Sequence, residues 1–273
     1  MLAGKPMRPM PMPALACLSL IAAMSGPVPW ALAASRAAAQ EFVYCAALSA
    51  PPLGFLDDTA QPSGLNVDLG NEIAARLKRE PKWLIVPFKG IIPALLARQC
   101  DAILSQLFDK PERREVIDIV DYMNSSESLL VKAGNPAKVA GLGDLSGLKV
   151  AVNTGTTIQV WLDKQNAIFA AAGKPPAVIV PLPKDTDALQ QLQIGQADVY
   201  GTTLETAVYY MTKAPGRFEV AGPPFARVLT GIGLRKDEAA LGRDLERVLA
   251  AMKADGSYAR IFAKWHLEDD MLP

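Results

Sequence analysis

The alternation of short β-rich runs with amphipathic helical stretches constrains the fold of this chain more than any other feature. Residues 42–45 predict a first strand, and residues 68–78 place Leu69, Ile73 and Leu77 at the i, i+4, i+8 spacing of one helical face. The alternation continues with predicted strands at 83–86, 101–104, 148–152, 178–180 and 197–200 and predicted helices at 90–98, 185–194 and 241–252. This pattern predicts an α/β fold with largely parallel strands.

The first 39 residues are typical of a secretory signal peptide. Lys5 and Arg8 precede an apolar run over residues 14–24, and small residues at 31–33 and 37–39 offer cleavage sites. We expect cleavage after Ala39 and a soluble, exported mature chain, because the run is shorter than the roughly 20 apolar residues that a bilayer requires. A lipoprotein anchor at Cys17 is the alternative, although the residues before it match a lipobox poorly.

Charge and cysteine content narrow the classes of function. Removing Lys5, Arg8 and Arg36 from the 28 basic residues leaves 25 basic against 28 acidic residues. Without a basic stripe or a nucleic-acid-binding motif, a nucleic-acid partner is not expected. Cys45 and Cys100 remain after processing, so one disulfide or two buried thiols are both compatible with export.

Two turn-rich segments divide the mature chain. Residues 132–136 separate the first α/β unit from a second that begins near residue 148, and residues 221–224 end that second unit. The segment after them carries Leu241, Leu245 and Val248 at helical spacing but has no strand set of its own to cover. We therefore expect it to pack back on the first unit.

Several short phrases occur in the order and spacing of one known family. They are Pro51-Pro52-Leu53, Gly64-Leu65-Asn66-Val67-Asp68-Leu69, Phe88-Lys89-Gly90-Ile91-Ile92-Pro93-Ala94-Leu95, Asp101-Ala102-Ile103-Leu104-Ser105, Pro111-Glu112-Arg113-Arg114, Gly155-Thr156-Thr157, Gly195-Gln196-Ala197-Asp198 and Gly233-Leu234-Arg235-Lys236-Asp237. Through them essentially the whole mature chain resembles the family 3 bacterial solute-binding proteins, the polar amino-acid receptors of ABC importers.

The resemblance implies a two-lobed periplasmic-binding-protein type II fold. Each lobe would be a mostly parallel sheet flanked by helices, and two crossovers would form the hinge. Lobe one would comprise residues 40–130 plus 226–273, and lobe two residues 131–225. A ligand would bind in the interlobe cleft, where strand ends and helix N-termini meet. The fold also places the strands of Cys45 and Cys100 side by side, which favours a disulfide.

The resemblance further implies a carboxylate-binding side of the cleft. Arg113 matches the arginine that grips the ligand carboxylate, since a guanidinium offers two parallel donors to a planar anion. A surface ion pair with Glu112 or Glu115 is the alternative. The amides around Thr156 and Thr157 would point from a helix N-terminus into the cleft, a role compatible with an ordinary N-cap.

Other ligand contacts follow from the same match, and some positions depart from it. Ser105 and Gln106 fall at contact positions, and Phe88 matches an aromatic that packs on the ligand, although core packing is its alternative. The family aspartate that holds an α-amino group is replaced by Thr203, which cannot neutralise a cation. We therefore expect standard α-amino acids to bind weakly, unless Glu205 or Asp109 supplies the acid. Ala50 and Lys110 also depart from the family pattern.

The residues favour a receptor over an enzyme. No catalytic triad, zinc spacing or phosphate loop can be assembled, and the one histidine, His266, lies far from the cleft segments. The same fold supports cyclohexadienyl dehydratases, for which Glu205 would be the catalytic candidate. We expect a monomeric periplasmic protein without cofactor or metal, whose partners are a small carboxylate ligand and an ABC permease. An accessory or sensory binding protein without its own importer is the alternative.

Overall fold

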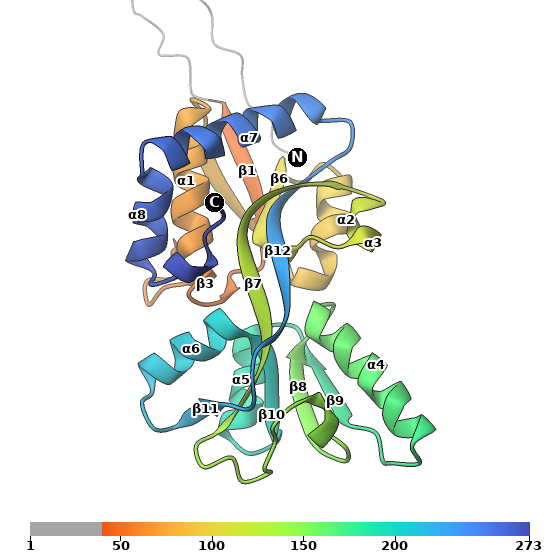
Figure 1. Cartoon of the computed structure of the whole chain (residues 1–273). Coiled ribbons are helices and arrows are strands. Elements are labelled where there is room, and N and C mark those ends of the chain that lie inside the picture. Colours follow the sequence, from red (N-terminus) through yellow and green to blue (C-terminus); the bar gives the residue numbers. More distant parts are fainter. Residues whose placement is uncertain (1–39) are drawn as a thin grey trace, which may run out of the picture. The chain divides into compact units, whose positions relative to one another are not determined.

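The computed structural model describes residues 40–273 (Figure 1). The predicted signal peptide, residues 1–39, and the alternative anchor Cys17 lie outside the described residues. Within residues 40–273, none of the helices combines the length and the apolarity that crossing a membrane requires.

Nine strands form the main sheet. Eight follow the order β5-β1-β6-β12-β7-β10-β8-β9, and β11 pairs with β7. Their bounds are Glu80–Ile85 for β5, Glu41–Ala46 for β1, Ala102–Phe108 for β6, Phe225–Leu234 for β12, Asp118–Lys132 for β7, Val199–Thr203 for β10, Lys149–Asn153 for β8, Val178–Leu182 for β9 and Phe218–Val220 for β11. The triplets β5-β1-β6 and β10-β8-β9 are parallel, as predicted. A small second sheet joins β2 (Ser49–Ala50), β3 (Gly54–Leu56) and β4 (Pro62–Ser63).

The helices connect and cover these strands. They are α1 (Leu65–Arg76), α2 (Ile91–Leu96), α3 (Pro111–Arg114), α4 (Thr157–Ala171), α5 (Asp185–Gln193), α6 (Leu204–Lys213), α7 (Ala239–Ala254) and α8 (Ser257–Lys264), with short 3₁₀ turns η1 (Phe88–Gly90), η2 (Leu142–Asp144) and η3 (Glu268–Asp270). The fold is therefore the two-lobed α/β architecture that the sequence predicted, with helices on the faces of a central sheet (Figure 1).

The buried apolar side chains gather into separate cores. Tyr44 and Leu69 share one core with Leu245 and Phe262 from the C-terminal helices α7 and α8, which confirms that the last segment packs on the first unit. A second cluster contains Cys45 and Ile103 together with buried residues of α2. Two further clusters contain only buried residues between 129 and 221. The lobe boundaries at residues 130 and 226 stay predictions.

Two long antiparallel strands, β7 and β12, link the two parallel triplets (Figure 1). Strand β7 was not predicted, because its middle, residues 124–128, is a polar run that is typical of a loop. It is a strand because its backbone pairs with β12 on one side and with β10 on the other. Three polar side chains of this run, Ser125, Glu127 and Ser128, are consequently buried.

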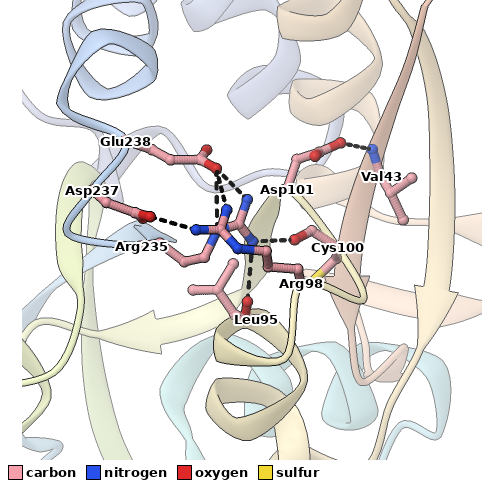
Figure 2. Close-up of polar contacts among 8 residues, drawn as sticks. All are labelled: Val43, Leu95, Arg98, Cys100, Asp101, Arg235, Asp237 and Glu238. Atoms are coloured by element: carbon pink, nitrogen blue, oxygen red, sulfur yellow. Dashed lines mark hydrogen bonds and ion pairs between the residues drawn. The ribbon is translucent and has the colours of Figure 1, made fainter.

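A disulfide and a buried arginine hold the loop before β6. The Cys45 and Cys100 sulfur atoms are bonded, with the Cα atoms 5.6 Å apart, so the alternative of two thiols is wrong. Figure 2 shows Arg235, which donates from Nη1 to the carbonyl oxygens of Leu95 at 3.0 Å and Cys100 at 2.6 Å and pairs with Glu238. The phrase around Arg235 thus has a structural role close to the disulfide.

Candidate ligand-binding site

All seven side chains predicted to contact a ligand line one pocket. These are Phe88, Ser105, Gln106, Arg113, Thr156, Thr157 and Thr203. The pocket has a cavity volume of about 60 Å³. This is room for several waters or for a small solute. The lining comes from both α/β units, since η1, β6 and α3 face the N-terminus of α4 and the end of β10 across it.

Arg113 presents its guanidinium to this pocket. Short helix α3 begins with Pro111, whose fixed φ suits a first helical position. Arg113 Nη1 donates to the carbonyl oxygen of Phe108 at 2.8 Å, and the guanidinium lies over the Phe88 ring, 5.6 Å from its centroid. Burial lowers the pKa of Arg113 from its ordinary value, but arginine keeps its charge in proteins. Among the described residues no carboxylate forms an ion pair with it, so the expected alternative pairing with Glu112 or Glu115 is not found.

The N-terminus of α4 borders the same pocket. Thr156 is the N-cap, and its Oγ1 donates to the carbonyl oxygen of Asn153 at 2.6 Å, while Thr157 is buried at the first helical position. Gly155 adopts a φ of +83°, and a Cβ there would lie 3.1 Å from the Lys89 Cα in the opposite unit. Glycine therefore permits both the left-handed turn and the close approach of the two units.

A hydrogen bond crosses the pocket between Gln106 and Thr203. Gln106 Nε2 donates to Thr203 Oγ1 at 3.0 Å and lies 3.3 Å from Ser125 Oγ. Gln106 has a φ of +52°, an unusual conformation for a residue in a strand, and such conformations cluster at ligand sites. Ser105 Oγ accepts a hydrogen bond from the Ala47 amide at 2.9 Å.

Sequence reasoning missed a second polar cluster on the pocket wall. Asp185, the first residue of α5, accepts hydrogen bonds from Asn153 Nδ2 at 2.6 Å and from the Tyr200 hydroxyl at 2.8 Å, and Ser49 Oγ lies 3.4 Å from it. Burial raises the pKa of Asp185, and these hydrogen bonds oppose the rise. Asn153 lines the pocket, and its Oδ1 is buried without a partner among the described residues. Only the position of Asp185 after a predicted strand could have signalled this cluster.

Glu127 is the other acidic side chain of the lining that the sequence did not reveal. It lies in the middle of β7, opposite Thr203 in β10, and is 2% exposed. Burial raises the pKa of Glu127 to about 8, Glu205 adds to the rise, and Lys110 and Arg113 oppose it. No apolar alternation signals a buried strand here, because residues 124–128 are all polar.

The two acids that the sequence suggested lie outside the pocket lining. Asp109 accepts two hydrogen bonds from Arg114, from Nε at 2.5 Å and from Nη2 at 2.7 Å. Glu205 is 5% exposed in the first turn of α6, and its Oε2 has no partner among the described residues. Burial raises the pKa of Glu205 to about 7 although Ser125 and Thr203 stabilise its ionised form by hydrogen bonding. Neither residue lines the pocket.

A family profile, a relative and a solved structure all match most of the described chain. The profile of the bacterial extracellular solute-binding proteins, family 3, matches residues 42–268. The ABC transporter glutamine-binding protein GlnH of Bacillus subtilis (strain 168) is 31% identical over 211 residues, which cover 76% of this chain and 73% of that protein. A solved ancestral arginine-binding protein bound to glutamine has a TM-score of 0.76 at 29% identity and covers 84% of this chain and 98% of its own.

A further solved structure bears on the choice between receptor and enzyme. The ancestral amino acid-binding protein AncCDT-1, a precursor of cyclohexadienyl dehydratase, has a TM-score of 0.75 at 28% identity. The match covers 82% of this chain and 95% of that one. The fold similarity therefore extends to the ancestry of an enzyme, through a protein that is itself described as binding amino acids.

Proposed function

The chain belongs to family 3 of the bacterial extracellular solute-binding proteins, and from this we propose that it binds a small carboxylate-bearing solute, an amino acid or a relative, for an ABC importer. It would do so as a monomer in the periplasm, with an ABC permease as its partner. GlnH, the glutamine-binding protein of an ABC transporter, supports this assignment.

The Arg113 guanidinium carries the proposal. It lines the pocket, it has no ion-pair partner among residues 40–273, and Phe88 and the Phe108 carbonyl hold it in place. A buried cation without a counter-ion is unfavourable unless a ligand supplies one. A planar carboxylate matches the two parallel donors of a guanidinium. The N-terminus of α4 at Thr156 and Thr157 adds dipole stabilisation for the same anion.

Binding without catalysis is part of the proposal. Glu205, the catalytic candidate of the sequence, is buried and is not part of the pocket lining. A general acid or base must come within hydrogen-bond reach of the proton that it transfers. The described pocket therefore favours a receptor. An accessory or sensory role shares the same pocket, and a permease and an ATPase gene beside this one would distinguish the importer.

A thermal-shift screen of the mature chain, residues 40–273, tests the proposal. A ligand that binds only the folded state raises the melting temperature. We expect carboxylates among amino acids, organic acids, amines and sugars to do so in the wild type and to lose the effect in Arg113→Ala. Stabilisation by sugars or amines alone, or carboxylate binding that survives in a folded Arg113→Ala protein, would overturn the assignment.

A further inference from the structure

We propose that Glu127 binds a cationic nitrogen of the ligand, so that the pocket selects solutes carrying both a carboxylate and a positive charge. The inference rests on the proposed function, because Glu127 would be a second contact in the pocket that Arg113 defines. It assigns ligand selectivity to a residue of the linking strand β7 rather than to the helix ends.

The position of Glu127 directs its carboxyl into the pocket. Glu127 and Thr203 are directly paired across β7 and β10, and both line the cavity. Directly opposed residues of an antiparallel pair project on the same face, with Cβ atoms about 4.5 to 5.5 Å apart. The Thr203 hydroxyl already accepts a hydrogen bond from Gln106. Glu127 therefore contributes the acidic group on this part of the wall.

The carboxyl of Glu127 is buried and has no partner of its own. Glu127 is 2% exposed, and none of the hydrogen bonds or ion pairs found in residues 40–273 involves its carboxyl, whose oxygens are not among the fully buried unpartnered atoms, unlike Glu205 Oε2. Asp185, the other lining acid, has Asn153 and Tyr200 as donors. An unpaired buried carboxylate is unfavourable, and a ligand cation would compensate it. Asp185 does not need such a ligand.

The cationic side chains of the protein near Glu127 do not serve as its counter-ion. Lys110, the N-cap of α3, and Arg113 in α3 favour the ionised form of Glu127. Glu205 from α6 and Asp185 from α5 disfavour it. Lys110 pairs with Glu112 instead, at 3.8 Å, and does not line the pocket. Burial outweighs the cations and holds the pKa of Glu127 near 8. A ligand cation in contact with the carboxyl would reverse that balance.

Calorimetry with matched probes tests the inference. The pairs are L-glutamine with glutaramate, L-arginine with 5-guanidinopentanoate, and 5-aminopentanoate with pentanoate; the members of each pair differ by one ammonium group. Wild-type protein should prefer the ammonium-bearing member of at least one pair. Glu127→Gln, which keeps the side-chain shape, should reduce that preference by about tenfold or more, the range for a hydrogen bond between charged groups.

Two carboxyl-to-amide controls separate direct contact from general electrostatics. The two controls, Glu246→Gln in α7 and Glu268→Gln in η3, change exposed residues that do not line the pocket. Both should keep the wild-type preference to within about threefold. Because amide replaces an unpaired buried acid, Glu127→Gln should melt no lower than the wild type without ligand, which shows that it folds.

The outcomes separate this inference from the proposed function. An unchanged preference in Glu127→Gln, an equal loss for both members of every pair, or no preference for an ammonium group in the wild type overturns the role of Glu127. If plain carboxylates still bind and Arg113→Ala abolishes their binding, the proposed function stands alone. If no carboxylate binds the wild type, both fail.

Discussion

The two ends of the pocket, the Arg113 end and the Glu127 end, differ in how their charges are held. At the first, a short helix, an aromatic ring and a carbonyl oxygen fix a guanidinium that faces the neighbouring N-terminus of α4. At the second, an unpartnered carboxyl comes from the middle of a strand, next to the hydrogen bond between Gln106 and Thr203. The first end is preorganised for an anion, whereas the second requires the ligand to complete it.

The difference shows that a site can lack an acidic residue at the expected position and still contain a carboxyl from another residue. The resemblance led us to expect an acid where Thr203 stands, and hence weak binding of α-amino acids. Glu127 on the paired strand supplies a carboxyl one strand away. The cation position is therefore displaced across the sheet, which changes the geometry that a ligand must have rather than abolishing the charge.

Removing the guanidinium should have the largest effect. Arg113→Ala should cost about 2 to 5 kcal/mol of binding free energy, the range for truncating one partner of a buried charge pair. Arg114→Ala is the matched control, because Arg114 pairs with Asp109 outside the lining. Calorimetry with any probe that binds measures both variants. Wild-type affinity in a folded Arg113→Ala protein would contradict the role of the Arg113 end in binding the ligand.

Placing a carboxyl at position 203, where the family has an aspartate, should have the next largest effect. Thr203→Asp should improve binding of α-amino acids relative to their des-amino analogues by about 1 to 3 kcal/mol if the new charge-assisted hydrogen bond resembles others. Beside Glu127 the new acid meets a like charge, so the gain should be greater in Thr203→Asp combined with Glu127→Gln. Calorimetry on the three proteins decides this, and a smaller gain in the double variant would contradict the paired geometry.

Phe88 offers a smaller perturbation of the Arg113 end alone. Phe88→Leu removes the aromatic face beneath the guanidinium but keeps much of the apolar volume. A cation–π contact is worth about 0.5 to 2 kcal/mol, so both members of a matched probe pair should weaken by a similar factor. If only the ammonium-bearing member bound more weakly, Phe88 would act at the Glu127 end, contrary to this prediction.

The ligand-free protein should show the raised pKa values of both acids in the dependence of its stability on pH. The pKa values of Glu127 and Glu205 are raised to about 8 and about 7 from an ordinary 4.5. Their protonated forms therefore contribute stability that is complete below pH 4.5 and is lost as the pH rises toward 8. Melting curves at pH 5 and pH 8 should show this fall, at roughly 2 to 4 °C for each kcal/mol lost. Glu127→Gln should flatten it, and a rise with pH would contradict the burial of both acids.

Periodicity and short phrases were sufficient to predict most of the fold and the Arg113 end. The strands and helices around Tyr44, Leu69 and Leu245 follow local apolar spacing, which the sequence displays directly. Arg113, Thr156 and Thr157 belong to contiguous phrases, so the resemblance placed them without knowledge of tertiary contacts. The disulfide between Cys45 and Cys100 followed from the strand order that the resemblance implied.

The Glu127 end could not be predicted in the same way, because tertiary pairing overrides local preference there. Residues 124–128 are polar and resemble a loop, yet β12 and β10 pair with them on both sides and bury Ser125 and Glu127. Asp185 enters the site through Tyr200 and Asn153, which are distant in sequence. Register between strands, rather than composition, places these acids in the pocket, and a single sequence does not display register.

Proton release on binding tests most directly whether the ligand completes the Glu127 end. Binding of the preferred ammonium-bearing probe is measured at pH 7 by calorimetry in two buffers of different ionisation enthalpy. Because the pKa of Glu127 lies near 8 before binding, contact with a cation should make it ionise, so the wild type should release protons and bind more tightly as the pH rises from 6 to 8. Glu127→Gln should release fewer protons. Binding without proton release in the wild type, or the same release in Glu127→Gln, would contradict the account.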